Sequence, residues 1–178
     1  MRYTVDTYSP ASARSIERKN ESMKRAFTNG IILDGTKDMV PQRGKAVLTE
    51  DGIIMDIVPD NEIPGGYEKN DLGGKYILPG LINLHVHLAG SGKPKKKQSD
   101  PVRLVRLITS SSFTRSIGRK LVAGYAKTQL LSGVTTIRTV GGISDFDTYV
   151  RDKINSGKLL GPRILASNMA ISVHGGHM

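Results

Sequence analysis

No cysteine occurs among the 178 residues, and this absence excludes several kinds of chemistry. A chain without cysteine forms no disulfide, builds no cysteine-ligated zinc site and offers no thiol nucleophile. No stretch approaches the roughly 18 consecutive apolar residues of a membrane-spanning helix, and the N-terminus lacks the apolar middle of a secretory signal. We therefore expect a cytoplasmic protein in which histidine and carboxylate side chains would hold any metal.

Acidic residues are scarce in one segment of the chain. Between Ser91 and Lys127, ten Lys and Arg residues stand against one acid, Asp100, and this segment accounts for most of the formal net charge of +10. Such a segment can bind an anionic partner, admit an anionic substrate or remain a solvated loop. No aromatic residue is interleaved with the "KPKKK" run, so nucleic-acid binding is not expected.

Short apolar runs and turns divide the chain into three predicted parts. Residues 1–22 are polar and show no apolar periodicity, so they are predicted to form a flexible N-terminal extension, with Met23 as a candidate alternative start. Residues 23–78 contain several short β-type runs, and Asp51-Gly52 is a dipeptide favoured in two-residue hairpins. Gly73-Gly74 repeats this turn pattern, so a small β-domain is predicted.

The third part, residues 79–178, alternates between strand and helix patterns. After Pro79-Gly80, "LINLHVHL" is a continuous apolar run, typical of a strand buried on both faces in a parallel sheet, and the basic loop follows it. Helical spacing then predicts a helix between Phe113 and Leu131. The side of this helix predicted to pack on a sheet carries Ile117, Leu121, Gly124, Thr128 and Leu131.

Two more strands and one more helix complete this alternation. "SGVTTIRTV" over residues 132–140 is a β-branched run typical of a strand. Ser144 and Asp147 predict a capping box for a helix that extends through Ile154. Pro162 introduces a third strand, "RILASN". The order strand, helix, strand, helix, strand predicts a parallel α/β domain.

Only four histidines occur in the chain, and His85 and His87 lie one residue apart in the first apolar run. Side chains alternate along a strand with a period of two, so both imidazoles are predicted to project from the same face, close enough to bind one metal ion. A pair of hydrogen-bonded core histidines is the alternative interpretation. Metal binding is favoured by the position, because α/β folds place their sites at the carboxyl ends of parallel strands.

The run "PGLINLHVH" resembles the Pro-Gly-Leu-Ile/Val-Asp/Asn-x-His-x-His strand of the metal-dependent amidohydrolase superfamily. "NGIILDGT", "VLTEDGIIMDI" and "GGKYILPG" resemble the composite β-domain that precedes the barrel in this family. "LLSGVTTIRTVGG" and "GPRILASNMAISVHGGHM" are similar to the second- and third-strand segments of the branch that contains imidazolonepropionase and metal-dependent Xaa-Pro dipeptidases. The resemblance covers about Phe27 to Met178.

The resemblance implies an α/β fold, with a composite β-domain over residues 23–78 and the first three βα units of a (β/α)8, TIM-like barrel over residues 79–178. It implies hydrolysis of an amide or cyclic-amide C–N bond, in a dipeptide or a non-peptide small molecule, by a metal-activated water. His85 and His87 would bind a divalent metal ion, with zinc expected and one or two ions in a complete site. The complete enzyme is expected to be a homo-oligomer without membrane partners.

Four further positions bear on the substrate and on the strand ends. His177 lies in a Gly-Gly-His loop similar to that of the branch and is a candidate substrate-binding residue. His174 is a second candidate, with an exposed loop histidine as the alternative. Arg138 could bind a substrate carboxylate or satisfy loop carbonyls and a structural acid. Thr139 stands where many members of the branch have Asp after "TTIR".

Several residues of the family pattern have no counterpart in this sequence. These are the lysine or glutamate of the fourth strand, the histidines of the fifth and sixth, and the acid of the eighth that acts as general base. We therefore expect an N-terminal portion of a barrel that is inactive as a hydrolase by itself. Two other hypotheses stay open, namely a non-catalytic binding fragment that uses the basic segment 93–127 for an anionic partner, and a non-functional gene remnant.

Overall fold

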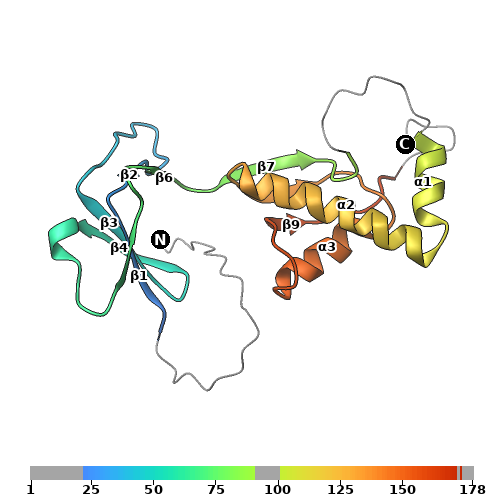
Figure 1. Cartoon of the computed structure of the whole chain (residues 1–178). Coiled ribbons are helices and arrows are strands. Elements are labelled where there is room, and N and C mark those ends of the chain that lie inside the picture. Colours follow the sequence, from blue (N-terminus) through green and yellow to red (C-terminus); the bar gives the residue numbers. More distant parts are fainter. Residues whose placement is uncertain (1–21, 91–100, 172, 174–178) are drawn as a thin grey trace, which may run out of the picture. The chain divides into compact units, whose positions relative to one another are not determined.

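The computed structural model describes residues 22–90, 101–171 and 173, and the chain divides into two compact units on either side of the Pro79–Gly80 bond (Figure 1). The predicted N-terminal extension, apart from Ser22, and the "KPKKK" run lie outside the described residues. Within the described ranges, no helix is both long enough and apolar enough to cross a membrane. The first unit consists of short strands, and the second combines a parallel sheet with helices.

The first unit contains two small sheets. Its elements are β1 (Lys24–Thr28), β2 (Ile31–Ile32), β3 (Lys45–Glu50), β4 (Ile53–Pro59), the 3-10 helix η1 (Asp60–Glu62), β5 (Glu68–Asp71) and β6 (Tyr76–Ile77). One sheet has the strand order β4-β3-β1-β5, with β1 antiparallel to β3 and parallel to β5. The other sheet pairs β2 with β6 in parallel. The prediction of short strands for this part of the chain is confirmed.

The predicted hairpin at Asp51-Gly52 is also confirmed, because these two residues connect the antiparallel strands β3 and β4. Both have positive φ values, 49° and 81°, which is the backbone conformation that an Asp-Gly pair tolerates in a two-residue turn. Beside the hairpin a small apolar cluster forms, with Ala26, Ala46 and Leu48 buried at its centre.

The prediction that Gly73-Gly74 forms the same kind of turn between paired strands is wrong. Both glycines have positive φ values, 59° and 77°. However, β5 before them pairs with β1, and β6 after them pairs with β2. The turn therefore carries the chain from one sheet to the other. A Gly-Gly pair permits a chain reversal, but the apolar pattern of the partner strands decides which strands pair.

The second unit contains a three-stranded parallel sheet with the order β7-β8-β9. Its elements are β7 (Leu81–Val86), α1 (Pro101–Thr109), α2 (Ser112–Leu131), β8 (Val134–Thr139), α3 (Phe146–Asn155) and β9 (Arg163–Leu165). The predicted alternation of strands and helices in a parallel sheet is confirmed. Helix α1, at the C-terminal end of the predicted basic loop, was not expected, because its nine residues are too short a window for a clear apolar period.

The helix predicted between Phe113 and Leu131 is confirmed as α2, but the side predicted to pack is wrong. Ile117 and Leu121 are 44% and 51% exposed. The buried residues of α2 are Gly118, Val122 and Ala126. A Cβ atom added to Gly118 would lie 2.5 Å from Cε2 of Phe146 in α3, so the two helices approach most closely along the side of α2 that carries small residues.

The strand predicted from "LINLHVHL" is confirmed as β7, but its burial on both faces is not found in the described part of the chain. Val86 and Leu88 are buried in the cluster that the helices cover. Toward the beginning of β7, the apolar residues Leu81, Ile82 and Leu84 are exposed. The end of the strand thus packs under helices, and its beginning carries apolar side chains in contact with solvent.

The predicted capping box of Ser144 and Asp147 is wrong. Asp145 occupies the N-cap of α3, where no side chain makes a capping hydrogen bond. Ser144 precedes it with a φ of 51°, a left-handed conformation that turns the chain before the helix begins. Asp147 is 1% exposed and packs inside the unit instead of capping the helix.

Candidate metal centre

The carboxyl ends of β7, β8 and β9 lie along one edge of the second unit's sheet. The register pairs Val86 of β7 with Thr139 of β8. Two hydrogen bonds tie the strand ends together, since Val140 N donates to Val86 O at 3.1 Å and Ser167 N donates to Thr139 Oγ1 at 3.0 Å. Parallel α/β sheets bind ligands at this edge, so it is the candidate site.

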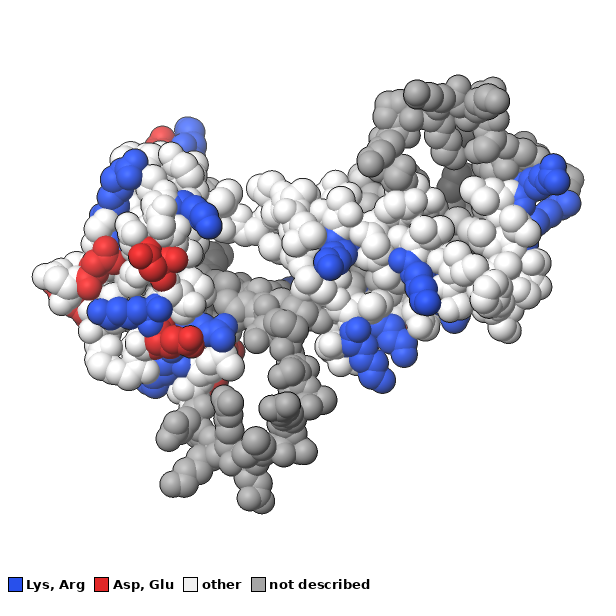
Figure 2. All heavy atoms as spheres, in the orientation of Figure 1, with Lys and Arg blue, Asp and Glu red and all other residues white. Residues whose placement is uncertain are grey.

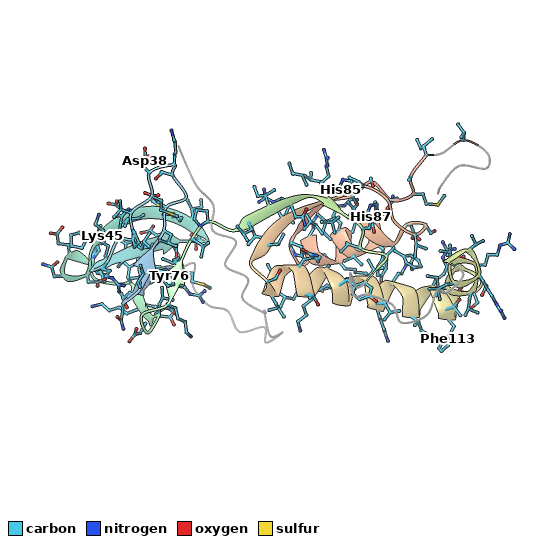
Figure 3. The ribbon with its side chains drawn as sticks, turned by 90° about the horizontal axis from the view of Figure 1, so that it is seen from above. Asp38, Lys45, Tyr76, His85, His87 and Phe113 are labelled. Atoms are coloured by element: carbon cyan, nitrogen blue, oxygen red, sulfur yellow. The ribbon has the colours of Figure 1, made fainter. Side chains whose placement is uncertain are left out.

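His85 and His87 lie at this edge, His85 near the end of β7 and His87 directly after the strand. Val86 between them is buried, whereas both histidines are exposed, so their rings project from the face that the helices do not cover. The ring centroids are 5.3 Å apart and the ring planes meet at 69° (Figure 3). The structure brings together the two residues that the sequence singled out.

The separation of the two rings fits a shared metal ion. Two imidazoles that each place one nitrogen ~2 Å from a tetrahedral ion have ring centroids about 5 Å apart. The centroids of His85 and His87 are 5.3 Å apart, which fits this value. Among the described residues, no group of three or more His, Cys, Asp or Glu side chains is placed to hold a metal. The described part of the chain therefore supplies two candidate ligands.

The orientation of His87 is set by a backbone carbonyl at the end of β8. Its Nδ1 atom lies 3.0 Å from Gly141 O. A carbonyl oxygen can only accept, so Nδ1 is the donor in this contact, and in the neutral ring Nε2 keeps its lone pair. The position of His85 is set locally, because its backbone N–H donates to Asn83 Oδ1 at 3.1 Å.

Arg138 lies on β8, on the same uncovered face of the sheet as the histidines. It is exposed between two buried residues, Ile137 and Thr139. Its Nε donates to Leu84 O at 2.9 Å, so part of the guanidinium satisfies the backbone of β7. This contact is the structural role considered for Arg138, and the exposed remainder of its side chain faces solvent beside the site.

Asp147 is a residue of this region that the sequence analysis assigned to another role. Burial raises the pKa of Asp147, while the nearby Thr139 hydroxyl and the charge of His87 oppose the increase. Neither carboxylate oxygen makes a hydrogen bond of normal geometry. A signal was present in the sequence, because Asp147 shares its helical stripe with Val150 and Ile154, which are also buried.

Two arginines of the basic segment are engaged within the second unit. Arg115 Nη2 donates to Ser144 Oγ at 2.7 Å, and Arg115 and Arg119 both form ion pairs with Asp145. Burial opposes the effect, but the hydrogen bond from Arg119 holds the pKa of Asp145 below its usual value. Arg119 also lies over the ring of Tyr149. Figure 2 shows other Lys and Arg side chains spread over this unit.

The remaining candidates lie outside the described residues. These are His174, His177 and the lysines of the "KPKKK" run. Their predicted contacts with substrate or with an anionic partner stay predictions.

Known proteins resemble this chain over most of its described length. It is 28% identical over 127 residues to the dihydroorotase of Trichlorobacter lovleyi, covering 62% of this chain and 29% of that protein. It is 42% identical over 48 residues to the imidazolonepropionase of Salmonella arizonae, covering 26% of this chain and 12% of that protein. The chain therefore spans less than a third of the length of these relatives.

A solved structure agrees with these sequence relatives. A Xaa-Pro dipeptidase with bound methionine in its active site matches with a TM-score of 0.65 and 31% identity, over 86% of this chain and 35% of that one. The pattern of the Amidohydrolase family matches residues 76–176, which is more than half of the sequence and includes both histidines of the site. Given this match, the fold and the edge on which the histidines lie, the chain belongs to the Amidohydrolase family.

Proposed function

We propose that this chain is the N-terminal portion of a metal-dependent amidohydrolase that hydrolyses a carbon–nitrogen bond other than a typical peptide bond. The observation that carries the proposal is the pair of imidazoles at the carboxyl end of β7, 5.3 Å apart and facing away from the covering helices. Relatives named for the hydrolysis of cyclic amides and of a Xaa-Pro dipeptide support the reaction class.

In this proposal His85 and His87 are ligands of a divalent metal ion, with zinc as the expected ion. The ion would supply a Lewis acid that lowers the pKa of bound water and polarises the substrate carbonyl. The Gly141 carbonyl holds the proton on Nδ1 of His87 and so presents Nε2 to the site. Neutral imidazoles leave the positive charge of the ion intact, which suits both tasks.

The substrate that we propose is a small molecule with an amide or cyclic-amide bond, and the basic character of the second unit favours an anionic one. Residues 80–178 contain fifteen Lys and Arg against four Asp and Glu. A dipeptide, an N-acyl amino acid or a cyclic imide would fit this charge. We propose the exposed part of Arg138 and the loop histidines His174 and His177 as substrate contacts.

Further groups are needed before this site can turn over substrate. Two imidazoles leave a zinc ion short of its usual three protein ligands in a catalytic site, and hydrolysis also needs a general base. We propose that these groups lie outside the 178 residues and that the chain by itself binds metal weakly without hydrolysing an amide.

Metal binding by the 178-residue chain tests the proposal. Titration with Zn²⁺ in a calorimeter should give one site per chain, and His85→Asn or His87→Asn should weaken it by about 100-fold or more, because losing even an outer partner of a ligand costs about 10- to 100-fold. His174→Asn is the matched control, since it removes an imidazole outside the pair, and should leave the affinity unchanged. Equal affinity in wild type and in both ligand variants would contradict the proposal.

A further inference from the structure

Two segments of the chain carry opposite charge, and neither contains a residue of the other sign. Residues 46–68 contain six Asp and Glu and no Lys or Arg, whereas residues 101–131 contain six Lys and Arg and no Asp or Glu. The first segment includes β4 and η1, and the second forms α1 and α2. In Figure 2 the visible Asp and Glu side chains lie over the first unit only. The two segments are therefore complementary in charge.

The basic segment exposes an apolar face along α2. Phe113, Ile117 and Leu121 are exposed and follow one another at a spacing of four residues. Lys120 and Lys127 are exposed on the same side, because residues three, four or seven positions apart share a helix face. Neither lysine forms an ion pair with the residues that the structure describes. These five residues are called the basic surface below.

The acidic segment also exposes apolar side chains, on the edge strand β4 of its sheet. Met55, Asp56 and Ile57 are three consecutive exposed residues of this strand, and Glu62 is exposed in η1, which follows it directly. Within the described ranges, neither Asp56 nor Glu62 is paired with a Lys or Arg side chain. An exposed apolar edge strand is a place where another chain can pack. These four residues are called the acidic surface below.

Charge disfavours the pairing of α2 with α2 of another copy. In an antiparallel pair of identical helices, residues at equal distances from the centre face each other. Pairing Leu121 with Gly124 of the other copy would bring Lys120 close to Lys127, and it would do so twice because of the two-fold symmetry. A parallel pair would bring each lysine beside its own equivalent. A surface that carries carboxylates fits this side of α2 better.

We propose that copies of this chain associate head to tail, with the basic surface of one copy packed against the acidic surface of the next. The apolar side chains of both surfaces would be buried in the contact, and the unpaired lysines would meet unpaired carboxylates, which sets the orientation. Because two different surfaces meet, association can continue beyond a dimer unless a ring closes. The inference goes beyond the proposed function and does not depend on the metal site.

Sedimentation velocity of the 178-residue chain at increasing concentrations tests the proposal. The mean sedimentation coefficient should rise with concentration, and NaCl should reduce the rise, because salt screens exposed charges. The basic-surface variant, Lys120→Glu with Lys127→Glu, should weaken association by about tenfold or more, since it places like charges opposite each other. The acidic-surface variant, Asp56→Lys with Glu62→Lys, should do the same. A wild-type chain that stays monomeric at every concentration would overturn the proposal.

Two further variants test whether the two surfaces meet each other. The combined variant carries all four substitutions, so the charges of both surfaces are exchanged and attract again. It should recover association, and a combined variant that associates no better than either parent would overturn the proposal. The matched control is Lys75→Glu with Lys158→Glu, which changes the net charge equally at exposed lysines outside both surfaces. The control should associate as the wild type does.

The apolar part of the contact is tested with Phe113→Ala. Phe113 is 76% exposed, so the variant should keep the melting temperature of the wild type while its self-association weakens. Met169→Ala removes a side chain that is 64% exposed outside both surfaces, and it should leave association unchanged. Equal association of wild type and Phe113→Ala would contradict the packing of this side of α2 in the contact.

Two other occupants of the basic surface give distinct results, and either result would overturn the proposal. If the two surfaces of one chain meet each other, the basic-surface variant changes the sedimentation coefficient by the same amount at every concentration. If copies pair α2 with α2, the acidic-surface variant associates as the wild type does. In that case Lys120→Glu alone strengthens association, because it places a carboxylate beside Lys127 of the other copy.

Discussion

A glutamate of the first unit is held by two short hydrogen bonds, whereas a buried aspartate of the second unit has none of normal geometry. In the first unit Glu50 accepts from Lys24 Nζ and from Tyr67 Oη, both at 2.7 Å. In the second unit both oxygens of Asp147 lack a hydrogen bond. The charge balance differs as well, because residues 22–79 contain seven Lys and Arg against nine Asp and Glu, and residues 80–178 contain fifteen against four.

The two units also differ in what their sheets cover. In the second unit the helices bury one face of the sheet, around Phe146 and Ile137, and the two histidines are exposed at its edge. Exposed apolar side chains such as Ile82 and Leu84 and a buried carboxylate such as Asp147 do not stabilise the isolated unit. The candidate metal ligands His85 and His87 both lie in the second unit.

The largest expected effect comes from removing the Phe146 ring from the hydrophobic core of the second unit. Phe146→Ala should destabilise that unit by about 3–5 kcal/mol, because Phe146 is fully buried between α2 and the sheet. Amide hydrogen exchange followed by NMR measures the two units separately, and protection should fall in β7, β8 and β9 while β1 and β3 keep theirs. Phe113→Ala is the matched control, since Phe113 is 76% exposed and should change stability by less than about 0.5 kcal/mol.

An equal loss of protection in both units after Phe146→Ala would break the comparison. It would mean that the two units unfold together and not independently.

A smaller effect should follow from adding a single methyl group where α2 and α3 meet. Gly118→Ala places Cβ 2.5 Å from Cε2 of Phe146, and the resulting overpacking should cost about 1–3 kcal/mol. Gly124→Ala in the same helix meets nothing within 4 Å and should stabilise the unit by about 0.5–1 kcal/mol, since alanine favours the helix. Urea unfolding of the two variants should move the midpoint in opposite directions, and a shift in the same direction would show that the packed side of α2 has been assigned wrongly.

These two glycines also show why the helix was predictable and its buried side was not. Helical spacing fits the larger apolar residues Ile117 and Leu121 as well as it fits the small residues around Gly118. Periodicity gives the existence of a helix, but which side packs depends on the partner, and here the ring of Phe146 comes from a helix about 30 residues away in sequence. A prediction that places the larger apolar residues of a helix in the core therefore chose the exposed side of α2.

The candidate site likewise has a part that neighbouring residues predict and a part that depends on residues distant in the sequence. The shared face of His85 and His87 follows from the period of two along a single strand, so the sequence was sufficient to pair them. The carbonyl of Gly141 and the carboxylate of Asp147 approach from residues more than fifty positions away. The position of both groups depends on the register of the strands and on the residue at which α3 begins. The run "SDFD" over residues 144–147 instead predicted a helix cap at that place.

The smallest expected effect concerns acid stability in the first unit. A hydrogen bond from Lys24, followed by one from Tyr67, lowers the pKa of Glu50 from its ordinary value of 4.5. Because the folded state holds the proton less tightly than the unfolded state, the stability from Glu50 is fully present above pH 4.5 and is lost as the pH falls through the lowered pKa.

In Glu50→Gln the side chain no longer titrates, so the variant should be slightly less stable than wild type near neutral pH and equal to it in acid. Urea unfolding followed by the NMR signals of β1 and β3 at several pH values checks this, with Glu62→Gln, which removes an exposed carboxylate from η1, as the control. A gap between wild type and Glu50→Gln that stays constant from neutral pH into acid would show that the contacts of Glu50 act by packing and not by charge. It would weaken the contrast between the paired carboxylate of Glu50 in the first unit and the buried carboxylate of Asp147 in the second.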